Sequence, residues 1–439
     1  MKLLFTSELG YWLKLYLESR TGISIRVAFT NDYHELVFKQ GELMLTLKIL
    51  KDNNLALCTS LLKFSNDELK AFLPKSEIEE IFIISEVKDR ALISFEGQNE
   101  IFINYDLIFS IVAILNRYEE YYNEVTDKHG RYLLANSMLS KDNIYKKPVV
   151  DQLVYFIREL LEFRGFELVS EQFTYSISCD VDNIHRYKEV FFFRKALTLM
   201  KDLVLAPAFP FKYFLNSQNF AEKFDRHQTF DFMLIMADKY GFKYTFNFIV
   251  CNTSLRYDYR YKLGREFSKL IRLILSKNHK IGLHFSYNAL CDNTTSNELL
   301  KFERICQEFD TFFNSWRFHY LRFSVPKVLN LCFKGFYDTS FTFFESGGFR
   351  CGTCHAFTPF NLESNSIADF MISPLIVMEG SLLGYSNMSD EEFEREIYFL
   401  VKQCRLVNGN FSLLWHNSDL GNREKVLFEK TLKLLSSEA

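Results

Sequence analysis

Short apolar segments alternate with polar turns along the first quarter of the chain. Residues 43–49 and 81–84 are two such segments, and their period of two predicts strands. A helix is predicted from about Leu107. We therefore expect a smaller mixed α/β domain over residues 1–147.

The pattern of apolar and polar residues changes at residue 148. Pro148 opens a predicted amphipathic helix that Gly165 is placed to stop. Beyond it, short apolar strands alternate with helices. The strands are predicted over 173–179, 244–250, 280–283, 316–322 and 411–415, and the helices from Thr229 to Gly241, over 263–276, over 297–309 and at the end of the chain. This alternation predicts a parallel sheet, open or closed into a barrel, within residues 148–439.

Composition places the chain among globular proteins. At 439 residues two domains are expected, and 48% hydrophobic with 24% charged residues is ordinary, while 47 Phe and 23 Tyr predict large cores. The net charge of -3 does not indicate binding to nucleic acid or to an anionic membrane surface. A neutral ligand is favoured.

The cellular compartment is predicted from the number and spacing of the cysteines and from the lengths of the apolar segments. Nine scattered cysteines, an odd number, do not resemble a disulfide framework. The first residues lack the apolar core of a signal peptide, and no apolar run reaches the length of a bilayer span. We expect a soluble cytoplasmic protein without a transmembrane segment.

Ionisable residues fall at the ends of the predicted strands of the second half. They are Asp180 and Asp182 after the first, His284 after the third, Arg317 and His319 in the fourth and His416 after the last. The C-terminal ends of strands in a β/α barrel converge on one mouth. Carboxylates two residues apart on a strand point the same way, which favours a shared metal or general-base role over a solvated turn.

Two of these segments resemble the polysaccharide deacetylases of carbohydrate esterase family 4. Residues 178–183 resemble the first motif of that family, which implies that Asp180 is the catalytic base and Asp182 a metal ligand. Residues 281–288 resemble the second motif, in which two histidines four apart complete the metal site. Here His284 stands at the first position and Asn288 at the second. An amide is a poorer zinc ligand than imidazole.

Residues 316–321 resemble the third motif, whose arginine pairs with the base. The resemblance implies this role for Arg317. His319, two residues further on, either supplies the missing ligand nitrogen or acts through a hydrogen bond.

Residues 413–417 resemble the last motif, which implies that His416 is the general acid. Further residues are assigned to orienting the base and holding the substrate: Ser286, Tyr287, Asn288, Asp338 and Arg350. The resemblance covers residues 170–437 and implies a C-terminal (β/α) barrel of the deacetylase type.

The first domain has its own resemblance. The segment from Tyr105 to Asp151 is similar to a domain of unknown function that precedes a bacterial branch of these deacetylases. Its Glu119 and Glu120 are expected on a solvated helix face. A single Cys-x-x-Cys-His run at residues 351–355 is a weak metal signature. The remaining histidines, His34, His129, His185, His227 and His279, are expected in polar loops or on helix surfaces.

The resemblance implies a metal-dependent hydrolase that removes an acetyl group from an N-acetylated sugar or glycan. The cofactor implied is a divalent metal, zinc first, with cobalt or nickel as alternatives. Bacterial surface polysaccharide biosynthesis is the expected setting. Two alternatives stay open: a related barrel hydrolase acting on another amide or ester, and a catalytically silent glycan-binding relative.

Overall fold

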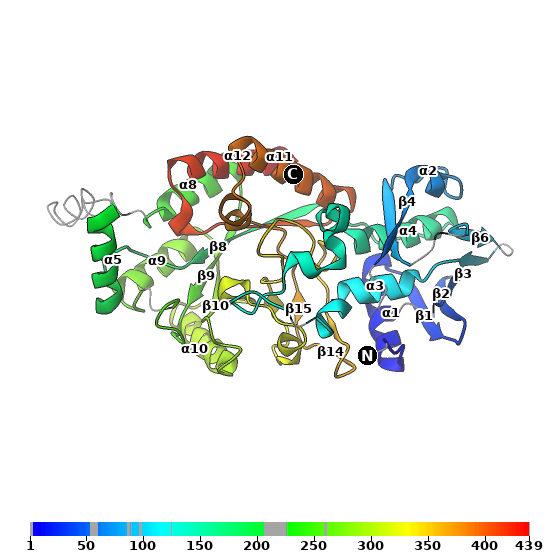
Figure 1. Cartoon of the computed structure of the whole chain (residues 1–439), viewed down its shortest axis with the longest axis horizontal. Coiled ribbons are helices and arrows are strands. Elements are labelled where there is room, and N and C mark those ends of the chain that lie inside the picture. Colours follow the sequence, from blue (N-terminus) through cyan, green and yellow to red (C-terminus); the bar gives the residue numbers. More distant parts are fainter. Residues whose placement is uncertain are drawn as a thin grey trace.

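A computed structural model describes most of the chain. The described residues are 3–52, 60–85, 88, 90–95, 99–123, 125–205, 225, 227–258 and 261–438. Figure 1 shows an elongated molecule, with the N-terminal elements gathered at one end and a larger α/β unit making up the rest. Within the described residues no helix is both long and apolar enough to cross a bilayer.

The N-terminal unit is a mixed sheet covered by helices. Its strand order is β1-β2-β3-β7-β6, antiparallel except between β3 and β7. The bounds are α1 Ser7–Thr21, β1 Ser24–Phe29, β2 Tyr33–Gln40, β3 Leu43–Leu50, β4 Leu61–Ser65, α2 Asn66–Lys70, β5 Glu80–Ile84, β6 Ile93–Phe95, β7 Glu100–Ile103, α3 Leu107–Leu115 and α4 Val149–Phe163. The expected smaller α/β unit is confirmed, and β4 pairs with β5 as a separate ribbon.

The C-terminal unit is built on a curled parallel sheet. Its eight strands run in the order β15-β12-β11-β10-β9-β8-β17-β16, and each described neighbouring pair is parallel. The bounds are β8 Thr174–Val181, β9 Tyr244–Ile249, β10 Lys280–Phe285, β11 Ser315–Phe318, β12 Tyr337–Asp338, β15 Met371–Ile372, β16 Val377–Met378 and β17 Asn410–Leu414. Within the described part of the chain the edge strands β15 and β16 do not pair, so the sheet is a half-barrel.

Helices alternate with these strands as the sequence predicts. They are α5 Phe192–Leu205, α8 Phe230–Tyr240, α9 Arg265–Ser276, α10 Thr295–Glu308, α11 Asp390–Leu406 and α12 Asn422–Glu438. Thr229 occupies the position before α8, but its hydroxyl donates to the Asn417 carbonyl instead of capping the helix. The ribbon β13 Phe360–Asn361 and β14 Ser366–Ile367 completes the described strands.

One expected strand is shorter than predicted. Residues 316–322 were expected to be extended, but β11 ends at Phe318. Tyr320 and Leu321 follow with φ of 63° and 56°, the left-handed region that side chains with a Cβ disfavour. The turn directs His319 out of the strand at its C-terminal end.

The two units share one continuous core. Trp12 of α1 donates its indole N–H to the Thr358 carbonyl at 2.7 Å. Val150 of α4 donates its backbone N–H to the Gly352 carbonyl at 2.8 Å. A Cβ on Gly352 would lie 2.9 Å from methyl groups of Ile114 and Val150, so the segment around Gly352 packs tightly on α3 and α4. The predicted boundary between residues 147 and 148 stays a prediction.

Candidate active site and metal centre

Four neighbouring strands bring the predicted residues to one edge of the sheet. The register pairs Asp180 of β8 with Asn247 of β9, and His284 of β10 with Arg317 of β11. Asp182 follows β8 by one residue. Because carboxyl ends of parallel strands meet at one edge, side chains distant in sequence converge there.

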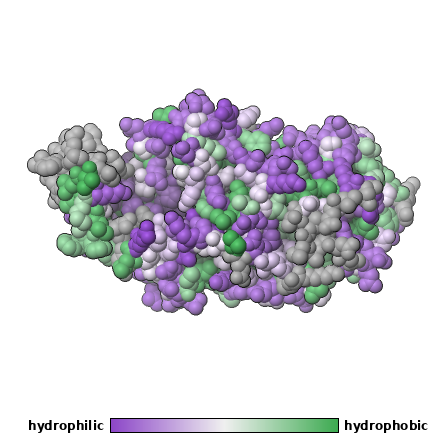
Figure 2. All heavy atoms as spheres, viewed as in Figure 1, coloured by the Kyte–Doolittle hydropathy of each residue, from purple (hydrophilic) through white to green (hydrophobic). Residues whose placement is uncertain are grey.

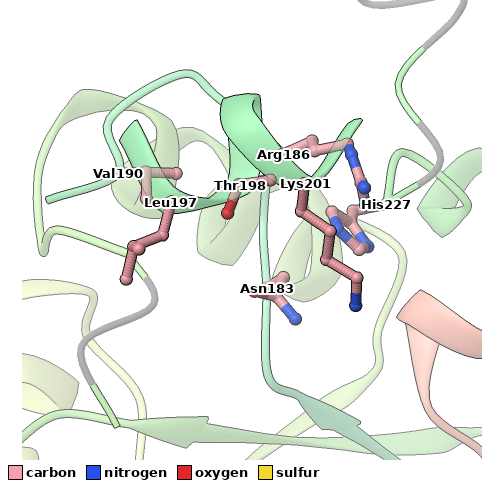
Figure 3. A pocket seen from close by; sticks show the side chains of 7 residues that line it. All are labelled: Asn183, Arg186, Val190, Leu197, Thr198, Lys201 and His227. Atoms are coloured by element: carbon pink, nitrogen blue, oxygen red, sulfur yellow. The ribbon is translucent and has the colours of Figure 1, made fainter. Parts of the chain in front are cut away.

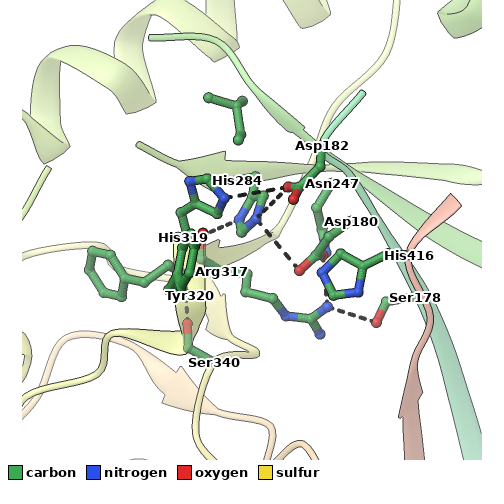
Figure 4. Close-up of polar contacts among 12 residues, drawn as sticks. Ser178, Asp180, Asp182, Asn247, His284, Arg317, His319, Tyr320, Ser340 and His416 are labelled. Atoms are coloured by element: carbon green, nitrogen blue, oxygen red, sulfur yellow. Dashed lines mark hydrogen bonds and ion pairs between the residues drawn. The ribbon is translucent and has the colours of Figure 1, made fainter. Parts of the chain in front are cut away.

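Asp182, His284 and His319 form a buried candidate metal centre. One ligand atom from each lies within 4.8 Å of the others. The Nε2 atoms of His284 and His319 lie 3.8 and 3.6 Å from the same Asp182 oxygen, Oδ1. These distances exceed a good hydrogen bond but are near the spacing of about 3.4 Å for ligands placed tetrahedrally around one zinc ion. Figure 4 shows the two rings facing Asp182.

Both histidines are held by their other ring nitrogen. Nδ1 of His284 lies 3.1 Å from the Arg317 carbonyl, and Nδ1 of His319 lies 3.0 Å from Asp258 Oδ1. Both partners accept hydrogen bonds, so each Nδ1 carries the proton and each Nε2 keeps its lone pair. Metal-binding histidines are usually oriented in this way.

Asp258 is a site residue that sequence reasoning missed. It lies between β9 and α9, and it accepts backbone N–H groups of Thr253, Ser254 and Tyr287 at 2.8–2.9 Å. Burial alone would raise the pKa of Asp258, but the hydrogen bond with His319 and the bonds from these backbone groups lower it. Only the folded loop brings this aspartate to His319.

Asp180 lies beside the candidate metal centre as a buried carboxylate. Its Oδ1 accepts Nη1 of Arg317 at 2.9 Å and Nδ2 of Asn247 at 2.8 Å, and its Oδ2 lies 3.6 Å from Nε2 of His284. Burial raises the pKa of Asp180, but the positive charge of Arg317 is among the effects that bring it below its usual value. Arg317 thus favours the ionised form of Asp180, next to the candidate metal ligands. Asn247 had no motif to mark it.

Arg317 is fixed by backbone and side-chain acceptors. Its Nε donates to the Thr339 carbonyl at 2.9 Å, and its Nη1 donates to the Ser178 hydroxyl at 3.0 Å. With its guanidinium held in this way, Arg317 reaches Asp180 in a single orientation.

Asp338 of β12 pairs in register with Trp316, the residue before this arginine, and no described contact joins it to Asp180. Its Oδ1 accepts the backbone N–H and the hydroxyl of Ser340, and that hydroxyl accepts the backbone N–H of Phe318. Burial raises the pKa of Asp338 to about 7. The expected part of Asp338 in orienting the base stays a prediction.

His416 pairs with Glu379, another residue without a sequence signal. Glu379 Oε1 lies 2.6 Å from Nδ1 of His416 and accepts its backbone N–H at 2.8 Å. Burial lowers the pKa of His416, but the charge of Glu379 and this hydrogen bond raise it well above its usual value. Figure 4 shows His416 and His284 on either side of Asp180. Glu379 therefore favours the protonated form of the His416 imidazole.

The Asn288 side chain contacts Thr253 and Arg322. Its side-chain N–H group donates to the Thr253 carbonyl at 3.3 Å, and its oxygen accepts from Arg322 at 3.4 Å. Ser286 donates its hydroxyl to Glu298, and the Tyr287 hydroxyl lies 2.7 Å from Nδ1 of His129. The substrate roles assigned to residues 286–288 stay predictions.

Arg350 lies in a buried ion-pair network. Its Nη2 and Nε donate to Glu120 at 2.6 and 3.0 Å, and Glu120 also accepts Nε of Arg117 at 2.7 Å. The expectation that Glu119 and Glu120 lie on a solvated helix face was wrong: Glu120 is buried, and Glu119 is half-buried and accepts the Ser137 hydroxyl. These charges are buried because they pair with arginines. A substrate contact by Arg350 stays a prediction.

His129, His185, His227 and His279 lie in loops, as expected, whereas His34 lies in β2, which corrects the expectation for that residue. His34, His129, His185 and His279 are buried, each beside a polar partner.

Asp151, Cys354 and His355 also come within ligand distance of one another, but Asp151 is already bound to Arg20 at 2.8 Å. Cysteines in the described residues are free, as expected; Cys58 lies outside them.

Comparison with known proteins gives a family match for the N-terminal part. Residues 4–165 match a family of unknown function, DUF7033. This agrees with the expected domain of unknown function, and the match continues to the end of α4. A protein from Mycobacterium smegmatis, named as a proposed polysaccharide deacetylase, is similar in structure with 14% identity and a TM-score of 0.37, over 61% of this chain and 87% of that one. No curated protein matches.

Proposed function

We propose that this chain is a metal-dependent hydrolase that removes the acetyl group from an N-acetylated sugar or glycan. The observation that carries the proposal is the buried triad Asp182, His284 and His319 with ionised Asp180 beside it. The acetamido sugar is inferred from the order of the motifs around Asp180, His284, Arg317 and His416.

The donor set fits a divalent cation of the zinc type. Two imidazoles and one carboxylate are the ligands of many catalytic zinc sites, which keep a further position open. The Nδ1 contacts of His284 and His319 leave both Nε2 atoms directed at Asp182. Bound there, the cation would supply the positive charge that polarises an acetyl carbonyl and favours ionisation of water.

The neighbouring residues divide the proton transfers. Asp180 takes the proton of the attacking water as that water bonds to the acetyl carbon. His416 donates its proton to the nitrogen as the carbon–nitrogen bond breaks, which yields acetate and a free amine. Arg317 keeps Asp180 ionised and fixes its orientation.

Acetate release tests the proposal. The purified chain loaded with zinc or cobalt should release acetate from N-acetylated amino sugars, with O-acetylated sugars assayed side by side. Release from O-acetyl substrates alone would replace the amide by an ester as the target. A chain that takes up no stoichiometric metal and releases no acetate from either class is a silent relative, and the proposal fails.

The dependence of kcat on pH should reflect the pKa of His416 in its pair with Glu379. His416 acts in its protonated form, so kcat falls as pH rises through its pKa, which Glu379 raises. Glu379→Gln removes the charge and leaves the burial, so the pKa of His416 falls and the alkaline limb of kcat moves to lower pH by about one unit or more. Glu379→Asp should keep most of the wild-type limb. A Gln variant with an unshifted limb contradicts His416 as the acid.

A further inference from the structure

The turn after β11 has a strained backbone. Tyr320 and Leu321 directly follow His319, and their φ values of 63° and 56° lie in the left-handed region that residues with a Cβ disfavour. Such a backbone persists only where surrounding contacts hold it. Because Nε2 of His319 lies 3.6 Å from Asp182, contacts that hold this turn also place a candidate metal ligand.

Residues 126–132 of the N-terminal unit, here called the clamp segment, contact this turn. Nη1 of Arg131 donates to the Tyr320 carbonyl at 3.3 Å. The centroids of the His129 and Tyr320 rings lie 4.7 Å apart. In Figure 1 the cyan chain that contains the clamp segment runs from the N-terminal end toward β10 of the other unit. A turn of the C-terminal unit is therefore held from the N-terminal unit.

The clamp segment is itself fixed by Asp127. One oxygen of Asp127 accepts Nε and Nη2 of Arg131 at 3.0 and 2.7 Å, and the other accepts the backbone N–H groups of His129 and Arg131 at 2.9 Å. Arg131 is 4% exposed, so its guanidinium is held in a buried ion pair. It therefore reaches the Tyr320 carbonyl in a single orientation.

The clamp segment also contacts the neighbouring loop after β10. Nδ1 of His129 lies 2.7 Å from the Tyr287 hydroxyl. The backbone N–H of Tyr287 donates to Asp258 Oδ1 at 2.9 Å, and the same oxygen lies 3.0 Å from Nδ1 of His319. The clamp segment is thus connected to His319 twice, through the Tyr320 turn and through the loop that binds Asp258.

We propose that the clamp segment positions His319 to bind the metal. Arg131 and His129 are positioning residues, since neither is one of the candidate ligands. The segment lies within residues 4–165, which match the family of unknown function, so this N-terminal part contributes to the site of the other unit. This role rests on the proposed function only for the metal centre, and zinc affinity tests it without turnover.

Arg131→Met should weaken zinc binding by the full chain about tenfold, the lower end of the loss that substitutions beside metal ligands cause. Methionine keeps the apolar stem but cannot donate to the Tyr320 carbonyl. Removing a positive charge near a cation would by itself strengthen binding, so the sign of the change separates positioning from charge. Arg131→Lys keeps the charge beside Asp127 but not the guanidinium fork, and should weaken binding about threefold. The readout is competition with a chelator of known affinity, supported by the visible absorption of the cobalt form.

Lys201→Met is the matched control for the lost charge. Lys201 lines a cavity of about 290 Å³ together with Asn183, the residue directly after Asp182, and Figure 3 shows Lys201, Asn183 and His227 around that space. It belongs to α5, which lies at the end of the molecule opposite the N-terminal unit, where green apolar residues gather in Figure 2. The control should bind zinc at least as tightly as the wild-type chain.

Tyr320→Asn tests whether the clamp segment acts through the turn. Asparagine adopts the left-handed backbone more readily than tyrosine, so the turn then needs less support from its surroundings. In the Tyr320→Asn chain, Arg131→Met should therefore weaken zinc binding by less than about threefold. A merely structural role of Arg131 would give the same loss in both backgrounds.

Three outcomes would overturn the positioning role. They are an Arg131→Met chain with wild-type zinc affinity, an equal loss of affinity in Lys201→Met, and a loss that Tyr320→Asn leaves unchanged. Acetate release is measured separately. A chain that binds zinc as expected but releases no acetate contradicts the proposed function alone, whereas a wild-type chain that binds no zinc contradicts both.

Discussion

Asp180→Asn should lower acetate release by about 10²–10⁴-fold and leave the metal bound. Asparagine keeps the shape of the side chain and its contact with Asn247 or Arg317, but its amide cannot take a proton from water. Asp180 has no place in the ligand triad, so the cation content of the variant should equal that of the wild-type chain. The measurements are acetate release at saturating substrate and metal per chain by elemental analysis.

Asp310→Asn is the matched control for this loss. Asp310 is exposed, has a left-handed backbone that asparagine adopts readily, and undergoes the same chemical change. It precedes the N-terminal end of β11, whereas His319 follows the C-terminal end of that strand. The control should keep wild-type activity. Release by Asp180→Asn at the wild-type rate would remove Asp180 from the mechanism, whereas a loss of bound metal in this variant would make it a ligand instead of a base.

The residues that sequence could place are those at regular strand ends. Asp180, Asp182 and His284 follow or end buried apolar strands, and alternation together with the parallel sheet is enough to bring them to one edge. The mixed N-terminal unit and the parallel C-terminal sheet were predictable for the same reason. The two-residue strands β12, β15 and β16 were not, because so short a segment has no period to detect.

Two site residues could not be placed from the sequence, for different reasons. Asp258 lies in a loop, and only the folded loop brings it to His319. Glu379 directly follows β16, which pairs in parallel with β17 and so brings it beside His416, but a two-residue strand has no period to detect. Glu120 was expected in solvent because charge runs usually are, but Arg350, distant in sequence, makes its burial possible. Pairing across such distances has no local signal in one sequence.

His319 decides whether the centre is complete, because Asn288 stands where the resemblance places a second histidine. Both readings of His319, ligand and hydrogen-bonding residue, were open from the sequence. The left-handed turn at Tyr320 directly follows His319. Nε2 of His319 lies 3.6 Å from the Asp182 oxygen that His284 also faces. We therefore expect that His319→Ala lowers zinc affinity at least about a hundredfold, a loss as large as or larger than outer-shell substitutions cause.

Two further variants serve as comparisons for the zinc affinity of His319→Ala. Asn288→Ala should leave zinc affinity near the wild-type value, because the Asn288 amide contacts Thr253 and Arg322. Asp258→Asn should have a zinc affinity between those of the other two variants, about 10–100-fold below the wild-type value. The His319 ring remains in this variant but loses its anionic partner. The readout is competition with a chelator of known affinity, supported by the visible absorption of the cobalt form. Should Asn288→Ala lose the metal while His319→Ala keeps it, the third ligand would be the amide, and the centre would be the weak one that the motif comparison implied.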